Sequence, residues 1–252
     1  MDVCVCIKRY PSLGSAIVLT GDGMAIDTEN LGFTLSPHEE CAVEAAVQLI
    51  EEHGGTVTLV SIGPEGVEEQ IREQFAIGAD RAIWIHSETT DLDPQAAAKA
   101  LADAIEADGT QFDLILLGSE SADNANAQTG VRLAHRLGRP VVTAVKGMKI
   151  ADGVATCERA VGTMREVYTV PLPAVVTVKD GLNIPRYPSV PGRIKARKKP
   201  IEEVPANLDA PKMELISLTA PIRESKGAQD LGAGEQAADA LVDVMKQIGV
   251  LS

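Results

Sequence analysis

Apolar runs suited to buried strands alternate with stretches of helical periodicity along the first 140 residues, and this alternation limits the folds open to the chain. The strand runs cover residues 3–7, 57–62, 82–86 and 113–117, and the helical stretches cover 36–54, 66–77, 94–107 and about 125–137. This order requires crossover connections, which place parallel strands side by side and helices on both faces of the sheet. We therefore predict an α/β fold with a doubly wound, mostly parallel sheet.

The first helix carries clear start and stop signals. Ser36 is suited to cap it, Pro37 to open it, and Glu39 follows three residues after the cap, which together form a capping box. Gly54 ends the pattern. The polar face of this helix carries Glu44, Glu51 and Glu52.

The pattern changes after residue 140. Strand-like runs at 141–149, 154–161, 165–170 and 174–179 are separated by turns too short for helical crossovers. Such pairs are antiparallel, so we expect the sheet to gain an antiparallel extension.

The last part of the chain predicts an arm. Residues 200–234 show little periodicity and are too long for an internal loop of a compact domain. A helix at about 235–248 follows, with an apolar stripe formed by Leu241, Val244, Met245 and Ile248. We therefore divide the chain into an α/β domain, 1–199, and a C-terminal arm with its helix, 200–252, and we expect another subunit to supply the surface that the apolar stripe covers.

The charge distribution bounds the partners. A formal net charge of −13 argues against a nucleic-acid partner. Between residues 179 and 199, however, seven basic residues and one acid leave a local charge of +6. Apolar and proline residues are interleaved with these cations, which predicts a fixed, irregular course over a surface and not a disordered tail.

Several classes of site and location are disfavoured. No apolar run is long enough to span a membrane, and the N-terminus does not resemble a signal peptide, so we expect a cytoplasmic location, with a mitochondrial matrix less favoured. Cys4, Cys6, Cys41 and Cys157 lack zinc spacing and the histidines are scattered, so no metal site is predicted. The motifs of P-loop, dinucleotide-binding, serine-hydrolase and zinc-protease sites are also absent from the sequence.

The segment 118–130, GSESADNANAQTG, is the strongest candidate for a binding site. It joins a predicted strand to a predicted helix, where free N–H groups and the helix dipole can hold a phosphate. It contains no lysine or arginine, which suits a single phosphate better than a triphosphate. We expect Glu120 to face solvent and Asp123 to order the loop, or to bind magnesium or water. A ligand-free crossover loop fits the local pattern equally well.

Two motifs together resemble a known family. They are GSESADNANAQTG and LPAVVTVKDGLNIPRYPSVPGRIKARKKPIE, at 172–202, and the chain is similar along its whole length to the β subunit of electron-transfer flavoproteins. The resemblance implies a fold of the adenine-nucleotide α-hydrolase-like kind. It also implies a heterodimer in which an α subunit holds most of an FAD, while the β subunit binds AMP and acts as an electron carrier subunit, not an enzyme.

The resemblance also assigns cofactor contacts. The family's AMP contacts fall on Cys6, Ser36, Pro37, His38, Glu39, Ile62, Gly118, Ser119, Ser121, Asp123, Asn126, Ala127, Gln128 and Thr129. Leu13 and His38 match positions that flank the flavin, and Glu166 matches a glutamate that regulates the mobility of the flavin-bearing domain.

Partner recognition is implied for residues 185–199. Val190 stands where the family has an apolar anchor, usually leucine, for acyl-CoA or amine-type dehydrogenases. The surrounding matches are Pro185, Arg186, Tyr187, Arg193, Lys195, Arg197 and Lys198. The implied role is electron transport, including that of fatty acid oxidation, with delivery to a quinone oxidoreductase.

Two alternatives remain open. In bifurcating relatives a second FAD occupies the AMP pocket and the complex oxidises NADH. The ending Gln128-Thr129-Gly130 resembles the carrier form, because bifurcating relatives tend to show a QVGP-like ending. A stand-alone adenine-nucleotide-binding regulator is the other alternative, and the long arm argues against it.

Overall fold

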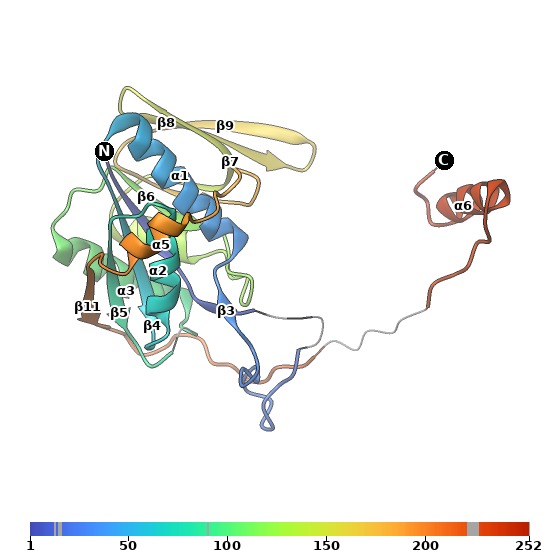
Figure 1. The fold of residues 1–252 in the computed structure, drawn as a ribbon, viewed down its shortest axis with the longest axis horizontal. Coiled ribbons are helices and arrows are strands. Elements are labelled where there is room, and N and C mark those ends of the chain that lie inside the picture. The colour runs from blue at the N-terminus through green and yellow to red at the C-terminus, as the bar shows by residue number, and fades with distance from the viewer. Residues whose placement is uncertain (13, 15–16, 90, 221–226, 252) are drawn as a thin grey trace.

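The computed structural model describes residues 1–12, 14, 17–89, 91–220 and 227–251. Its described strands form a nine-stranded sheet in the order β11, β5, β4, β1, β6, β10, β7, β8, β9 (Figure 1). They are β1 (Asp2–Ile7), β4 (Thr56–Gly63), β5 (Arg81–His86), β6 (Leu114–Gly118), β7 (Val141–Ala151), β8 (Val154–Val161), β9 (Met164–Pro171), β10 (Ala174–Val178) and β11 (Ile201–Pro205). Two short strands, β2 (Tyr10–Pro11) and β3 (Phe33–Thr34), pair separately. Neighbours from β11 to β7 are parallel, which confirms the predicted fold class.

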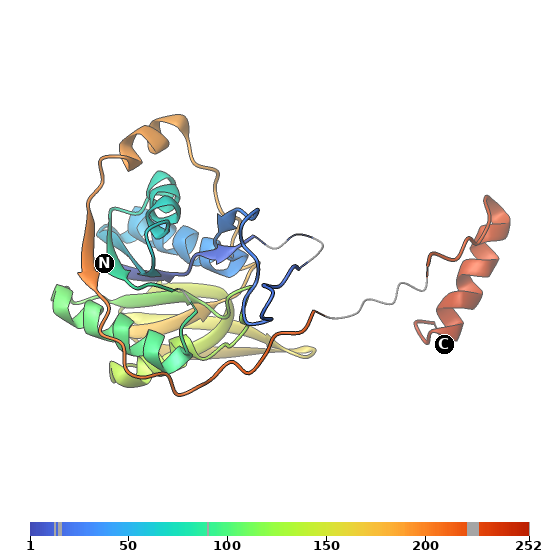
Figure 2. The same ribbon diagram turned by 90° about the horizontal axis from the view of Figure 1, so that it is seen from below.

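Helices cover both faces of the sheet. They are α1 (Pro37–His53), α2 (Val67–Ile77), α3 (Pro94–Asp108), α4 (Thr129–Arg136), α5 (Val190–Ala196) and α6 (Glu235–Gln247). α1 and α2 lie on one face, and α3 and α4 on the other (Figure 2). Each face carries its own apolar core, because successive side chains of a strand point to opposite sides.

α1 begins with the predicted capping box. Ser36 Oγ accepts a hydrogen bond from the Glu39 N–H at 3.4 Å, and a Glu39 carboxylate oxygen accepts one from the Ser36 N–H at 3.0 Å. Glu44 differs from the expectation of a polar face, since it is 2% exposed. The segment around Arg186 crosses α1 there and bonds its carboxylate.

The antiparallel extension is confirmed for β7, β8 and β9. The expectation that the run at 174–179 pairs antiparallel with the strand before it was wrong. β10 lies between β6 and β7 and is parallel to both. All five of its residues are buried, and a continuous apolar run of this kind is typical of a central parallel strand.

Two elements interrupt segments predicted to be irregular. β11 extends the sheet beside β5, with Ile201 packing against one core and Val204 against the other. α5 follows Ser189, whose side chain accepts a hydrogen bond from the Gly192 N–H, and Pro191 occupies its first turn. Proline is tolerated in a first helical turn, so the proline-rich pattern did not exclude a short helix.

α6 stands away from the sheet and its helices in both views (Figures 1 and 2). The predicted helix is confirmed. Leu241 is 49% exposed and Ile248 is 67% exposed, so part of the apolar stripe faces solvent in this chain. The division at residue 199 stays a prediction, although β11 lies beyond it in the sequence and belongs to the sheet.

Candidate functional site

A cavity of about 110 Å³ lies where β1, β4 and β6 end. β1 pairs with β4 on one side and with β6 on the other. The chain fills the sheet outward from β1 to β4 and β5, and then returns to the opposite side of β1 with β6, so the strand order reverses at β1. Ligands of open α/β sheets bind at such switch points. The predicted contacts that line the cavity are Cys6, Glu39, Ile62, Gly118, Ser119, Ser121, Asn126, Ala127, Gln128 and Thr129.

The remaining predicted contacts lie elsewhere. Ser36 and Pro37 form the start of α1 and are not among the residues that line the cavity. His38 Nε2 lies 3.2 Å from Asp180 Oδ1, on the segment after β10. Asp123 is held by Lys8, and Leu13 lies outside the described residues. Ligand binding by any of these residues stays a prediction.

The loop between β6 and α4 has an uncommon backbone. Ala125 and Ala127 have φ angles of 48° and 53°, whereas Asn126 between them does not have a positive φ. Alternation of this kind turns successive N–H groups to one side and forms an anion-binding concavity. It also prevents helix formation, so α4 begins at Thr129 and not at about 125 as predicted.

Two lysines from outside the loop neutralise its acids. Lys8 Nζ lies 2.6 Å from Asp123 Oδ2, and Lys179 Nζ lies 3.3 Å from Glu120 Oε1. Glu120 is therefore paired and half-buried, although we expected it to face solvent. The sequence signal was the position of each lysine directly after a strand run, because the carboxyl ends of parallel strands share one edge of the sheet.

Gly118 allows the loop to lie against the start of α1. A Cβ atom at this residue would lie 2.9 Å from Glu39 Cγ and 3.1 Å from His38 Cβ. A side chain at this position would therefore push β6 and α1 apart. Glu39, which lines the cavity, would move with α1.

Apolar side chains form the other side of the cavity. They are Ile7, Ile62, Leu92, Ala97, Leu101 and Leu117, from β1, β4, β6, α3 and the segment before α3. The cavity therefore has an apolar wall opposite a loop of hydroxyl, amide and backbone groups.

Glu39 is a buried acid on this cavity. It is 6% exposed, and its carboxylate accepts hydrogen bonds from the Lys8 N–H at 2.8 Å and from the N–H and hydroxyl of Ser36 at 3.0 and 3.1 Å. Burial raises the pKa of Glu39 to about 7, although these donors and the Lys8 charge oppose the rise.

This burial predicts a pH-dependent stability. An acid with a raised pKa in the folded state binds more protons there than in the unfolded state, so its contribution is present below pH ~4.5 and is lost as the pH rises through ~7. We expect Glu39→Gln to remove a difference of up to about 3 kcal/mol between pH 5 and pH 8. Urea unfolding of both proteins at the two pH values measures it, and equal differences in both would contradict the prediction.

The segment 185–199 forms an exposed surface at the far side of α2. Val190, Tyr187 and Ile194 are 73%, 95% and 61% exposed. Ile194 follows Val190 by one helical turn, and this i, i+4 spacing was the signal that sequence reasoning missed. The cations with exposed side chains are Arg193, Lys195, Arg197 and Lys198.

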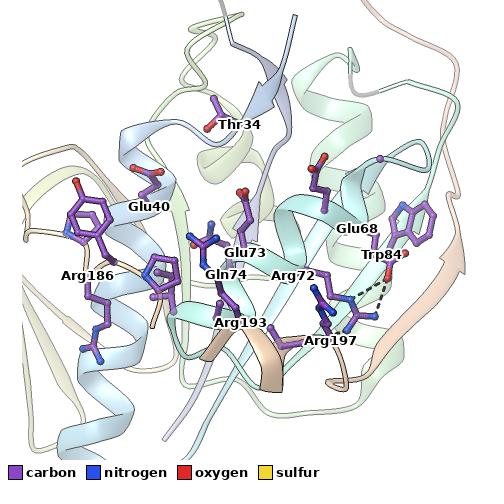
Figure 3. A pocket seen from close by; sticks show the side chains of 18 of the residues that line it. Thr34, Glu40, Glu68, Arg72, Glu73, Gln74, Trp84, Arg186, Arg193 and Arg197 are labelled. Atoms are coloured by element: carbon purple, nitrogen blue, oxygen red, sulfur yellow. Dashed lines mark hydrogen bonds and ion pairs between the residues drawn. The ribbon is translucent and has the colours of Figure 1, made fainter. Parts of the chain in front are cut away.

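A groove of about 1460 Å³ runs beneath this segment. Figure 3 shows acids and cations around this groove: Glu40 from α1, Glu68 and Glu73 from α2, Arg193 from α5, and Arg197 directly after α5. Burial first, and then the charge of Glu73, raise the pKa of Glu40. Pro185 and Arg186 also line the groove, but Arg186 is engaged with glutamates of α1.

Glu166 lies on β9, the last strand of the sheet. Its Oε2 atom accepts hydrogen bonds from Arg159 Nε at 2.6 Å and from the Tyr168 hydroxyl at 2.8 Å. The Arg159 bond is the main reason that the pKa of Glu166 is lowered. A regulatory role for this residue stays a prediction.

The described residues also lack two other kinds of feature. Within them, no group of three or more His, Cys, Asp or Glu side chains could hold a metal ion. None of the described helices has the length and apolar character needed to cross a membrane.

Comparisons with known proteins agree with these features. The family model described as Electron transfer flavoprotein domain matches residues 23–209. The chain is 34% identical to the electron transfer flavoprotein subunit beta of Bacillus subtilis and 33% identical to the mitochondrial subunit beta of Arabidopsis thaliana, with 98% of each chain covered in both cases. It is 35% identical to the caffeyl-CoA reductase-Etf complex subunit CarD of Acetobacterium woodii, over 80% of this chain and 77% of that one. The chain therefore belongs to the electron transfer flavoprotein family, as a β subunit.

Proposed function

We propose that this β subunit binds AMP in the cavity beside the 118–129 loop and docks partner dehydrogenases through residues 185–199. Membership of the family carries an electron-transfer role, an α-subunit partner and a flavin in the complex. FAD held mainly by the α subunit supplies the one-electron redox chemistry when bound. The part of this chain is to hold the nucleotide, help to enclose the flavin and present a docking surface.

The two-sided lining of the cavity is the observation that carries the AMP proposal. Apolar walls at Ile62 and Leu101 suit the faces of a base, and the loop offers hydroxyl, amide and N–H donors to a phosphate. The alternating φ angles around Asn126 support an anion at the loop. The cavity volume of about 110 Å³ suits a base in the enclosed part, with the sugar and phosphate along the open loop.

Charge pairing supports the same proposal. Glu120 and Asp123 would repel a phosphate if they were unpaired, but each carboxylate is bound by a lysine from outside the loop. The loop therefore presents a field close to neutral, and N–H groups can dominate its interaction with one phosphate.

A second FAD in the same cavity is the alternative. The similarity to the CarD subunit of a caffeyl-CoA reductase-Etf complex favours it, because that relative belongs to a complex with a reductase. We prefer AMP because the loop ends Gln128-Thr129-Gly130, as in the carrier form.

Counting the nucleotides of the purified heterodimer tests the proposal. We expect acid denaturation to release one FAD and one AMP per heterodimer, separated and quantified by liquid chromatography. Two FAD and no AMP would support the bifurcating alternative. A stable homodimer of this chain that lacks flavin would support the stand-alone regulator instead.

The docking proposal rests on one apolar anchor with cations around it. Val190 is exposed at the start of α5, and the four exposed cations of the segment lie on this helix or directly after it. A small apolar contact with rim charges gives fast, reversible association, which suits a carrier that serves several partners. We propose acyl-CoA or amine-type dehydrogenases as donors and a quinone oxidoreductase as acceptor.

A further inference from the structure

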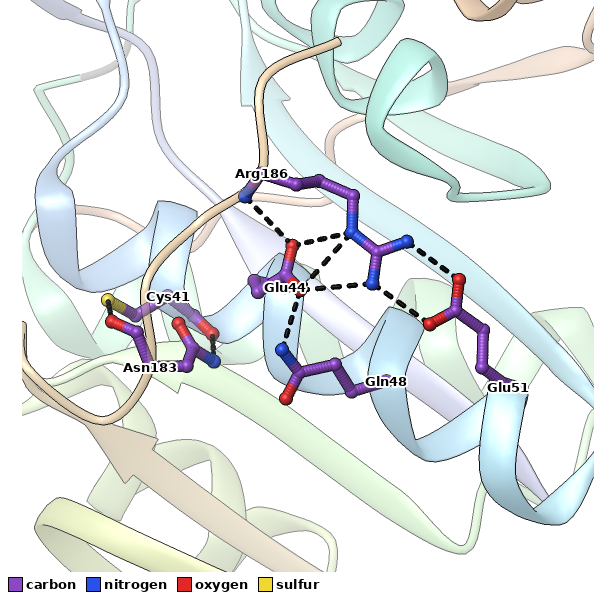
Figure 4. A network of polar contacts seen from close by, with 6 residues as sticks. All are labelled: Cys41, Glu44, Gln48, Glu51, Asn183 and Arg186. Carbon is purple, nitrogen blue, oxygen red and sulfur yellow. Dashed lines mark hydrogen bonds and ion pairs between the residues drawn. The ribbon is translucent and has the colours of Figure 1, made fainter. Parts of the chain in front are cut away.

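Arg186 differs from the four exposed cations of the 185–199 segment because its guanidinium is already bound within the chain. Its Nε and Nη2 atoms lie 3.0 Å from the two carboxylate oxygens of Glu44 (Figure 4). Its Nη1 and Nη2 atoms donate to Glu51 at 2.6 and 2.9 Å. The backbone N–H of Arg186 also donates to Glu44, at 3.1 Å. These bonds leave few donors of Arg186 free for a partner.

The acceptor side is built into α1. Cys41, Glu44, Gln48 and Glu51 recur at i, i+3, i+7 and i+10, so they share one face of the helix. Glu44 is 2% exposed, and Gln48 Nε2 donates to its Oε1 at 2.6 Å. One turn earlier, the carbonyl of Cys41 accepts a hydrogen bond from Asn183 Nδ2 at 3.0 Å. Residues 183–186 are thus attached to α1 at two successive turns.

The other end of α5 is attached to α2. Arg72 Nη1 donates to the carbonyls of Ala196 and Lys199 at 2.9 and 2.6 Å. Arg72 is itself oriented by Glu68, whose carboxylate accepts its Nη2 at 2.9 Å. α5 is therefore held at both ends, and Val190 stands exposed between them.

We propose that the Glu44–Arg186 pair is a positioning device for the docking segment: it fixes residues 183–186 on α1 so that α5 presents Val190 to the partner, and Arg186 itself makes no essential partner contact. This inference rests on the proposed docking function. A buried carboxylate without a charged partner is costly, so the segment is stable only where it brings the guanidinium to Glu44. Fixing the relative position of two segments is also the best attested role of buried charge pairs.

Glu44→Gln tests the device without touching the docking surface. It keeps the size of the side chain and removes its charge at a site that a partner cannot reach. The assay is steady-state reduction of the purified heterodimer by an acyl-CoA dehydrogenase of the same organism that reduces the wild type. We expect KM for the heterodimer to rise roughly tenfold, with kcat and flavin content unchanged. Hydrogen exchange of the amides at 183–190 should become faster.

A matched control and a reciprocal variant sharpen the test. Glu52→Gln removes a charge from the same helix at a side chain that is 74% exposed, and it should leave KM and exchange unchanged. Arg186→Gln should raise KM as Glu44→Gln does, and the double variant should be no worse than either. If Arg186 were a docking cation, Glu44→Gln would loosen its attachment within the chain and leave Glu51 as its remaining acidic partner, so KM would stay the same or fall, which would overturn the proposal.

Two further variants separate the positioning role of Arg186 from the docking function itself. Arg186→Lys keeps the positive charge but loses the forked bonds of the guanidinium. If Arg186 positions the segment, this variant should raise KM. If Arg186 is a docking cation, KM should stay unchanged. Val190→Ala should raise KM without changing exchange at 183–190. If Val190→Ala raises KM and Glu44→Gln does not, docking stands and the positioning role is wrong. If Val190→Ala leaves KM unchanged, the docking function is wrong and the device with it.

Discussion

Replacing Gly130 with alanine is expected to lower the free energy of unfolding by about 1–3 kcal/mol and to weaken the proposed binding of AMP to the heterodimer. The new Cβ atom would lie 2.3 Å from Thr177 Cγ2, far inside contact distance. Thr177 cannot move freely, because its hydroxyl accepts the Ala144 N–H at 3.1 Å and bonds the Ser119 hydroxyl at 2.9 Å. The start of α4 must therefore shift, and it carries the end of the 118–130 loop with it.

A second substitution should reverse the effects of Gly130→Ala. Thr177→Ser removes the Cγ2 atom but keeps the hydroxyl, and the next atoms, Leu117 Cδ1 and Thr177 Cβ, lie 3.7 Å from the new Cβ, an ordinary contact distance. We expect the double variant to recover most of the lost stability and AMP, measured by urea unfolding and chromatography. Gly32→Ala, where nothing lies within 4 Å of the added atom, is the control. A double variant as unstable as Gly130→Ala would contradict this account.

Much of the fold could be predicted because its signals are local. The capping box at Ser36, the glycine stops and the alternation of strand and helix runs act within a few residues, and each appears in the structure. The position of β10 was not predictable in this way, because its neighbours β6 and β7 are chosen by burial on both faces and not by the turn that precedes it. β11 was missed for a related reason, since five residues at a sheet edge show no clear period.

The candidate site shows the same division. The 118–130 loop is continuous in sequence, so its small polar residues and flanking glycines could be identified directly. Lys8 and Lys179 reach the loop only through the order of the sheet, which joins residues more than 50 positions apart. Arg186 is a different case: its place in a basic run predicts a docking cation, and no local pattern indicates its internal partner, the buried Glu44.

Introducing aspartate at both Leu241 and Ile248 is expected to weaken the heterodimer by more than roughly 100-fold, because each apolar side chain contributes about 1.5–3 kcal/mol when buried. Leu241 lies on α6 and Ile248 directly follows it, and the two side chains are 49% and 67% exposed in this chain. We propose that the α subunit covers this stripe, as the sequence predicts for another subunit, since α6 stands away from the α/β body in both views (Figures 1 and 2). Analytical ultracentrifugation of the purified heterodimer at decreasing concentration measures the dissociation constant.

Lys246→Gln serves as the control for this prediction, because Lys246 lies on the opposite, polar side of the helix. This substitution lowers the net charge by one, as each aspartate substitution does. It should leave the dissociation constant within about twofold of the wild type, since exposed charges contribute little. An equal loss of affinity in both variants would point to the charge and not to the apolar stripe. If the dissociation constant were unchanged in the variant with two aspartates, the α subunit would contact this chain elsewhere. The surface to test would then be β9, where Met164 and Val167 are 66% and 56% exposed.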